Sequence, residues 1–139
     1  MTQYSAILPN YNDAATLGDA LASLCAQTHP FAEIIVVDDG STDGSLHVIE
    51  AYAARMPNLR LIRHEKNQGV VAAINTGLAA ASGDFVFLCS ANDHYLPQMV
   101  AIAERVRVQF PAAAIISGNV ASFDAQKNRY GYDMTPSLP

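Results

Sequence analysis

The segment Ile34-Ile35-Val36-Val37 is an unbroken run of four β-branched residues, and it ends abruptly at Asp38-Asp39-Gly40-Ser41. β-Branched side chains favour extended backbone, and a run without polar alternation indicates a strand that is covered on both faces. Strands of this kind occur in parallel sheets, where a crossover segment connects each strand to the next. The run therefore predicts a buried parallel strand with helices on both sides of its sheet.

Strand-like and helix-like segments alternate along the chain. Apolar runs predict strands at 4–8, 33–37, 59–63, 85–89 and 113–116. Apolar residues at helical spacing predict four helices, whose inward-facing sets are Leu17, Leu21, Leu24 and Cys25, then Leu46, Ile49, Ala53 and Met56, then Val70, Val71, Ile74, Leu78 and Ala81, and finally Met99, Ala103, Val106 and Phe110. This order predicts right-handed βαβ units in an open, mostly parallel α/β sheet with helices on both faces.

Local signals refine the boundaries of these elements. Asn12 or Asp13 is expected to cap the first helix, and Gly83 to close the third. Basic residues alternate with apolar ones at 59–63, which predicts a strand at the edge of the sheet. The pattern weakens after residue 122, so we expect a domain at 1–122 and a tail at 123–139.

Composition excludes several classes of protein. The chain has 139 residues, half of them hydrophobic, which suits one folded domain. Its net charge of −5 argues against binding along a nucleic-acid backbone. No apolar run is long enough to span a membrane, and no signal segment is visible, so we expect a cytoplasmic chain. Cys25 and Cys89 lie in apolar surroundings and are expected to be free thiols.

The segments that follow the predicted strands are rich in hydrogen-bonding groups. Ligands of open α/β sheets bind outside the carboxyl ends of the strands, so these segments predict a binding site. No GxGxxG, GxxxxGK[ST], HExxH or paired CxxC pattern is present, which argues against the common dinucleotide site, the P-loop and a zinc centre. The segments are Pro9–Asn12, Asp38–Ser41, His64–Gly69 and Ser90–His94.

A calcium loop is an alternative interpretation of one segment. Asp39, Ser41, Asp43, Gly44 and Glu50 occupy the first, third, fifth, sixth and twelfth positions of an EF-hand pattern. An EF-hand needs a helix before the loop, whereas a β-branched run precedes this one. A strand-to-helix turn is therefore the favoured interpretation.

Several motifs together resemble family 2 glycosyltransferases of the GT-A fold. The resemblance covers roughly the first 120 residues, and the motifs stand in the order and spacing of that family. It implies a Rossmann-like fold that is truncated at its carboxyl-terminal side. It further implies transfer of a sugar from a nucleotide diphosphate to an acceptor, with inversion. The motifs are Ser5–Asn12, Val36–Asp43, Asn67–Gly69, Asn75–Leu78, Ala81–Asp84 and Phe87–Leu88.

The resemblance also implies a donor site. Pro9, Tyr11, Asp38 and Asp39 would surround the base and ribose of a nucleotide sugar, and Gly69 belongs to the same site. A carboxylate can accept the imide N–H of uracil or thymine, and a tyrosine can pack on a flat base. UDP- or dTDP-linked sugars are therefore the expected donors. A helix cap for Asp39 and a structural role for Asp38 remain alternatives.

The metal motif of the family is altered. Where the family has Asp-x-Asp after its fourth strand, this chain has Ser90-Ala91-Asn92-Asp93. The resemblance implies a Mg²⁺ or Mn²⁺ ion that bridges the diphosphate, held here by Asn92 and Asp93. Since an amide oxygen brings no charge, weaker metal binding is expected. The altered motif leaves a non-catalytic nucleotide-binding module as an alternative to an enzyme.

The catalytic base is not among the residues that the resemblance identifies. In the family, that base and most of the acceptor site lie beyond the region that these 139 residues match. We therefore expect the chain to be the donor-binding part of a longer enzyme, which as a whole could associate with a membrane.

Overall fold

The computed structural model describes residues 1–116, 118, 122–123 and 129–130. Contacts within the chain divide it after Ile102, into a first unit at Met1–Ile102 and a second at Ala103–Pro139. The domain boundary at residue 122 that the sequence pattern suggests stays a prediction. All four strand-end segments of the predicted binding site belong to the first unit.

A four-stranded parallel sheet forms the centre of the first unit. The strands are β1 (Tyr4–Asn10), β2 (Glu33–Asp38), β3 (Leu59–Arg63) and β4 (Phe85–Leu88), in the spatial order β3-β2-β1-β4. The chain moves from β1 outward to β3 and then returns to the other side of β1. Strand order thus reverses at β1, and a crevice at the carboxyl ends of strands is favoured at such a reversal. The expectations of a parallel sheet and of an edge position for β3 are confirmed.

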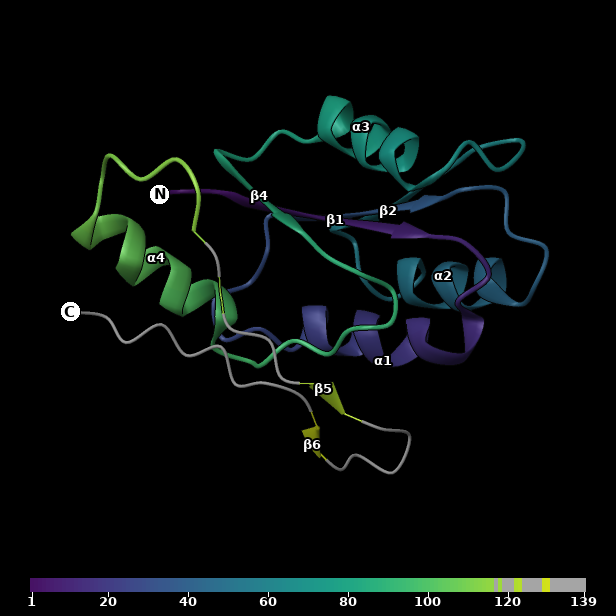
Figure 1. The fold of residues 1–139 in the computed structure, drawn as a ribbon, viewed down its shortest axis with the longest axis horizontal. Helices are drawn as coiled ribbons and strands as arrows, with labels where there is room; N and C mark the ends of the chain where they lie inside the picture. The colour runs from purple at the N-terminus through teal and green to yellow at the C-terminus, as the bar shows by residue number, and fades with distance from the viewer. Residues whose placement is uncertain (117, 119–121, 124–128, 131–139) are drawn as a thin grey trace. The chain divides into compact units, whose positions relative to one another are not determined.

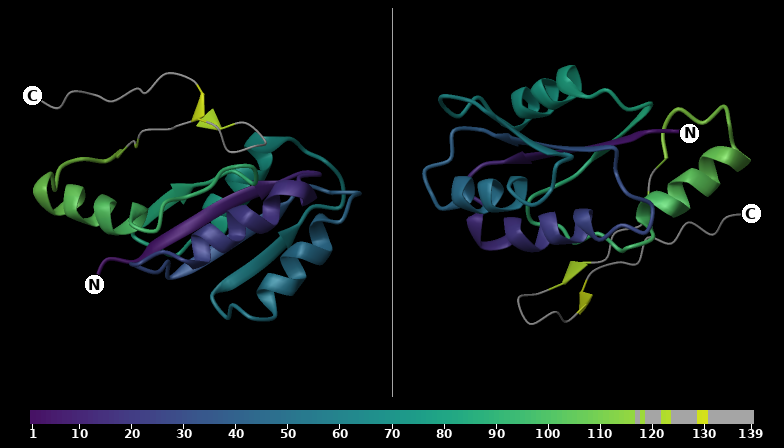
Figure 2. Two further views of the ribbon diagram at one scale, coloured as in Figure 1. Left: turned by 90° about the horizontal axis from the view of Figure 1, so that it is seen from below. Right: turned by 180° about the vertical axis from the view of Figure 1, so that it is seen from behind.

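Helices cover both faces of this sheet, as the sequence predicted. The α3 helix (Val70–Ala80) lies on one face, and α1 (Ala14–Cys25) and α2 (Ser45–Ala53) lie on the other (Figure 1). The view from behind shows the same two layers of helix around the sheet (Figure 2). A fourth helix, α4, spans Met99–Gln109. No helix in the described part of the chain is both long enough and apolar enough to cross a membrane.

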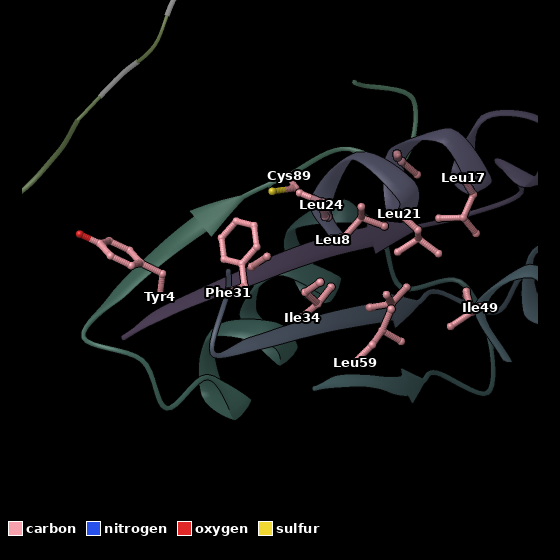
Figure 3. Close-up of a cluster of buried hydrophobic side chains, with 14 of the residues drawn as sticks. Tyr4, Leu8, Leu17, Leu21, Leu24, Phe31, Ile34, Ile49, Leu59 and Cys89 are labelled. Carbon is pink, nitrogen blue, oxygen red and sulfur yellow. The ribbon is translucent and has the colours of Figure 1, made fainter. Parts of the chain in front are cut away.

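The larger hydrophobic core lies between the sheet and α1. Leu17, Leu21 and Leu24 of α1 project toward Leu8 of β1, and all four side chains are buried (Figure 3). The three α1 residues are spaced three or four positions apart, so they share one face of the helix. The predicted inward face of α1 is therefore confirmed. Burial of these side chains fixes the loop between β1 and α1 above the carboxyl end of the sheet.

The predicted inward face of α3 is wrong. Val70, Val71 and Leu78 are exposed, and the buried positions are Ala73 and Gly77. A Cβ atom on Gly77 would lie 2.3 Å from Ile7 Cγ2, which shows how closely the helix approaches the sheet. Apolar residues occur around the whole of α3, so spacing alone did not identify the contact face, and the smallest side chains occupy it.

The predicted strand at 113–116 is also absent from the structure. These residues form no ladder with another described strand, and Ile115 is 88% exposed. A short apolar run becomes a strand only where a neighbouring strand supplies hydrogen-bond partners. In the second unit, β5 (Ser122–Phe123) and β6 (Arg129–Tyr130) pair as an antiparallel two-stranded sheet.

The two cysteines are free thiols, as predicted. Cys89 is buried beside the end of β4, and this burial raises the pKa of its thiol to about 12. Because the thiolate is the reactive form of cysteine, Cys89 is a packing residue and not a nucleophile.

Candidate functional site

A cleft of 230 Å³ lies at the carboxyl ends of β1 and β2, beside the start of α3. It is formed by segments that are distant in sequence and meet because their strands are neighbours in the sheet. This is the edge at which the sequence predicted a binding site. The lining residues are Pro9, Asn10, Tyr11, Asp13, Asp39, Asn67, Gly69, Val70 and Ala73.

The Asp39 carboxylate lies at the base of the cleft and accepts three hydrogen bonds. Its Oδ1 atom accepts from His64 Nδ1 at 2.7 Å and from the Gln68 backbone N–H at 2.9 Å. Its Oδ2 atom accepts from the Gly69 backbone N–H at 2.8 Å. Burial raises the pKa of Asp39, but these hydrogen bonds outweigh it and hold the pKa below the ordinary value. The group is therefore an ionised carboxylate that ties the end of β2 to the loop before α3.

Two glycines allow this loop to approach Asp39. Gly40 has a φ of +73°, and a Cβ there would lie 2.7 Å from the carbonyl carbon of Lys66. Gly69 has a φ of +93° and faces open space. Positive φ angles strain any residue that carries a Cβ atom. The loop conformation thus depends on Gly40 and Gly69, and the missing side chain of Gly69 leaves the cleft open.

Asp38 supports the cleft from beneath and does not line it. Its side chain is fully buried, where it accepts hydrogen bonds from Asn10 Nδ2 at 2.9 Å and from the Ser41 backbone N–H at 3.2 Å. Asn10 Nδ2 also donates to Ser41 Oγ at 3.1 Å. The Asn10 Oδ1 atom is buried without a hydrogen-bond partner. Asn10 is also one of the residues that line the cleft, so a residue with an unpaired buried acceptor belongs to the candidate site.

The loops after β1 and β2 cap one another, which corrects the expected cap of α1. Neither Asn12 nor Asp13 bonds to the start of α1 through its side chain. Instead, Asp43 Oδ2 accepts from the Ala14 backbone N–H at 3.0 Å, and Asn12 Oδ1 accepts from the Thr42 backbone N–H at 2.8 Å. A cap from a neighbouring loop cannot be recognised from local spacing, because the two partners are far apart in the sequence.

The loop after β4 carries the two predicted metal ligands, Asn92 and Asp93, and both are exposed. Tyr95 fixes this loop, since its hydroxyl lies 2.6 Å from the Ser90 backbone N–H and its own backbone N–H donates to Ser23 Oγ at 3.1 Å. The described residues contain no cluster of three or more His, Cys, Asp and Glu side chains that could hold a metal. One amide and one carboxylate nevertheless suit Mg²⁺, which commonly takes one or two protein oxygens beside phosphate and water.

Four of the seven predicted site residues line the cleft, namely Pro9, Tyr11, Asp39 and Gly69. Asn92 and Asp93 follow β4, which pairs with the other side of β1. The cleft residues that the sequence pattern did not mark as site residues are Asn10, Asp13, Asn67, Val70 and Ala73. Asn10 and Asn67 lie in segments that follow predicted strands, so strand ends are the signal that could have found them.

The geometry argues against the calcium loop. The segment is entered from β2, a strand, and its first position, Asp39, directs its carboxylate toward residues 64–69. Asp43 is engaged by the Ala14 and Ser45 backbone N–H groups. Two of the acidic ligands that the pattern would require are thus committed to other contacts.

Comparison with known proteins gives consistent results. The sequence model of Glycosyl transferase family 2 matches residues 5–135. The "Uncharacterized glycosyltransferase alr2836" of Nostoc sp. is 43% identical over 93 residues, which are 67% of this chain and 29% of that protein. Glycosyltransferase GlyG of Streptococcus pneumoniae is 28% identical over 131 residues, which are 94% of this chain and 43% of that protein. The chain thus spans less than half the length of these relatives.

Solved structures agree with the observed fold. S. aureus TarS 1-349 in complex with UDP-GlcNAc superposes with a TM-score of 0.72 at 32% identity, covering 77% of this chain and 31% of that one. The mannosyltransferase PcManGT from Pyrobaculum calidifontis, in complex with GDP-Man and Mn²⁺, gives a TM-score of 0.71 at 28% identity, covering 76% and 32%. The parallel sheet with helices on both faces is therefore a Rossmann-like GT-A arrangement.

Proposed function

This chain belongs to glycosyl transferase family 2, and we propose that it forms the donor-binding part of an enzyme that transfers a sugar from a nucleotide diphosphate to an acceptor. The observation that carries the proposal is the cleft at the ends of β1 and β2, with the ionised Asp39 carboxylate at its base. We further propose that transfer inverts the configuration at the sugar. Cytoplasmic location stays a prediction from the sequence.

The hydrogen bonds of Asp39 favour a uracil or thymine base. A carboxylate offers about four lone-pair positions, two on each oxygen. His64 and Gln68 use both positions on Oδ1, and Gly69 uses one on Oδ2. One acceptor position remains, which matches the single imide N–H of uracil or thymine. Guanine presents two adjacent donors and would need both carboxylate oxygens, so a UDP- or dTDP-linked sugar fits better.

Other cleft residues complete this nucleoside site. Tyr11 is 45% exposed and lines the cleft, so its ring is free to pack against a flat base. Pro9 supplies a second apolar surface, and Gly69 leaves room for the ligand. We assign Asp38 an indirect role, because its buried carboxylate holds Asn10 and the turn after β2 in place.

We propose that Asn92 and Asp93 hold a divalent cation, Mg²⁺ or Mn²⁺, beside the diphosphate. Such an ion neutralises the negative charge that builds on the leaving nucleotide. The two residues supply one amide oxygen and one carboxylate, so their affinity for the ion is lower than that of two carboxylates. Within the first 122 residues we assign no catalytic base. We place that base and the acceptor site beyond the tail at 123–139.

Titration calorimetry of the protein, expressed from its complete reading frame, tests the proposal. UDP and dTDP are expected to bind more tightly than GDP, and removal of divalent ions with EDTA is expected to weaken binding. Absence of binding by all three nucleotides, with Mg²⁺ or Mn²⁺ present, would contradict the assignment.

A non-catalytic nucleotide-binding module is the second candidate. It is favoured by Ser90 and Asn92, which leave Asp93 as the one carboxylate between residues 90 and 93. Hydrolysis of a UDP-sugar separates the two candidates. Slow release of sugar by the wild type, reduced by Asp93→Asn, supports an enzyme, whereas tight UDP binding without any release supports the module.

A further inference from the structure

We propose that His64 is a positioning residue that makes the Asp39 carboxylate selective for a base with a single donor. The inference rests on the proposed nucleotide site. It assigns a role to a buried histidine that lies behind the cleft and does not line it.

His64 connects the cleft to α3 through its two ring nitrogens. Nδ1 lies 2.7 Å from Asp39 Oδ1, and Nε2 lies 2.9 Å from Thr76 Oγ1. The His64 side chain is 9% exposed and that of Asp39 is 3% exposed. The backbone N–H of His64 also donates to the Asp38 carbonyl at 2.9 Å. Both ends of the imidazole are thus engaged, and the ring has a fixed orientation.

The partners hold both nitrogens of the ring. An ionised carboxylate only accepts hydrogen bonds, so Nδ1 must carry a proton. Nε2 is within hydrogen-bond distance of Thr76 Oγ1, so the second ring nitrogen is held as well. Helix α3 therefore orients the imidazole, and the imidazole orients Asp39. Gly77, next to Thr76, packs closely against the sheet. This close packing holds Thr76 in place, and with it the contacts from Thr76 through His64 to Asp39.

Selectivity follows from the acceptor position that His64 occupies. With Nδ1–H and the Gln68 N–H both on Oδ1, a ligand reaches a free position on Oδ2 alone. Loss of the Nδ1 donor frees one position on Oδ1 and lets the carboxylate turn. A base with two adjacent donors can then use both oxygens. Replacement of His64 by a residue without this donor should therefore lower the ratio of UDP affinity to GDP affinity.

Matched variants separate this role from simple packing. His64→Asn keeps a donor near the position of Nδ1, so it should keep the bond to Asp39. His64→Gln places its donor near the position of Nε2, so it should lose that bond, as His64→Ala does. Thr76→Val removes the hydroxyl partner but leaves Nδ1–H in place. Thermal unfolding followed by circular dichroism identifies the variants that fold.

The experiment is calorimetric measurement of UDP and GDP affinities for the protein expressed from its complete reading frame. The ratio of UDP to GDP affinity is expected to fall about tenfold or more in His64→Gln and His64→Ala, as for loss of one hydrogen bond to a charged group. His64→Asn should stay within about threefold of the wild-type ratio, the scatter normal for single contacts. Thr76→Val loses the partner of Nε2 but keeps Nδ1–H, so its ratio should lie between those of the wild type and His64→Ala. If folded His64→Gln or His64→Ala keeps the wild-type ratio of UDP to GDP affinity, the inference about His64 is overturned. UDP binding by the same variants would leave the proposed function intact.

A second measurement needs no variant. The ¹⁵N chemical shifts of the His64 ring are expected to show a proton on Nδ1, and observation of a ring protonated at Nε2 alone would overturn the inference. Failure of the wild type to bind any nucleotide is a different result, because it overturns the proposed function itself.

Discussion

At the scale of single residues, Gly77 determines how closely α3 approaches the sheet. Alanine at this position would gain about 1 kcal/mol of helix propensity. Its Cβ would, however, lie 2.3 Å from Ile7 Cγ2, and Ile7 is fully buried and cannot move aside freely. Overpacking of a core costs about 1–3 kcal/mol, which exceeds the gain in propensity. We therefore predict that Gly77→Ala lowers the free energy of unfolding, as measured by urea titration.

Gly18 in α1 is the matched control. A Cβ at Gly18 would have Val48 Cγ1 as its nearest neighbour, at 4.0 Å, which is ordinary contact. Gly18→Ala should therefore leave stability unchanged or raise it by up to about 1 kcal/mol. Equal effects of Gly18→Ala and Gly77→Ala would contradict the close approach of α3 to β1.

Asp39 is the second residue for which the structure makes a direct prediction. In Asp39→Asn, one carboxylate oxygen becomes an amide nitrogen, which cannot accept from the backbone N–H groups of the loop. UDP affinity is expected to fall about tenfold or more, because a charged acceptor is lost from the base of the cleft. Asp13→Asn at the rim of the same cleft is the control, and calorimetry that gives the two variants equal affinity would count against Asp39 as the base acceptor.

At the scale of elements, Glu33 joins three strands and the end of α3. Its Oε1 atom accepts from Ser5 Oγ at 2.7 Å and from the Ser82 backbone N–H at 2.6 Å, and Oε2 lies 3.3 Å from Arg60 Nη2. Arg60 also donates to the Ala80 carbonyl at the end of α3. We predict that Glu33→Gln lowers the free energy of unfolding at pH 7 by about 1–3 kcal/mol. Exposed Glu50 on α2 is the control, and Glu50→Gln should change stability by less than about 0.5 kcal/mol.

The effect of Glu33 depends on pH in a defined direction. Partial burial raises the pKa of Glu33, but the hydrogen bonds from Ser5 and Ser82 and the charge of Arg60 lower it below the ordinary value of 4.5. A carboxylate with a depressed native pKa stabilises the fold above the pKa of the unfolded chain. The free energy of unfolding of the wild type should therefore exceed that of Glu33→Gln by its largest amount at neutral pH. This difference should shrink as pH falls from 4.5 through the native pKa of Glu33. A difference that grows in acid would contradict this network.

Elements were predictable from sequence where their signal is local. The runs Ile34–Val37 and Phe85–Leu88 mark strands, and the spacing of Leu17, Leu21 and Leu24 marks the buried face of α1. The buried face of α3 was not predictable, because Val70 and Leu78 are as apolar as any core residue and glycine carries no hydrophobic signal. The predicted strand at 113–116 is wrong because a strand also requires a neighbouring strand to pair with, and an apolar run in the sequence does not show whether one is present.

The sequence was sufficient to predict which loops form the candidate site, but not which hydrogen bonds connect them. Parallel strands bring their carboxyl ends together, so the positions of Tyr11, Asp39 and Gly69 at one edge followed from the order of elements. The bond between Asp39 and His64 spans 25 residues and depends on the side-chain rotamers of both. The spacing of residues along the sequence does not reveal such a long-range hydrogen bond. The same is true of the bond by which Asp43 caps the helix at Ala14.

At the scale of the whole molecule, a ligand that binds the native state alone must raise its stability. The proposed function places a nucleotide in the cleft at the end of the sheet, in a chain whose net charge is −5. Stabilisation follows from mass action and reaches about 2.7 kcal/mol at a ligand concentration one hundredfold above Kd. UDP with Mg²⁺ is therefore expected to raise Tm in a concentration-dependent way, as followed by differential scanning fluorimetry.

Calcium provides the discriminating comparison in the same experiment. A functional EF-hand would give a rise in Tm with Ca²⁺ that Glu50→Gln abolishes, since the twelfth position supplies a bidentate ligand. In this structure β2 enters the loop, and the Asp39 carboxylate is bonded to His64, Gln68 and Gly69 instead of facing a cation. We predict that Ca²⁺ in the absence of nucleotide leaves Tm unchanged for both the wild type and Glu50→Gln. The opposite result would be a Ca²⁺-dependent rise in Tm that disappears in Glu50→Gln, together with no change in Tm on addition of UDP. That result would contradict the proposed nucleotide site and favour a calcium loop in this segment.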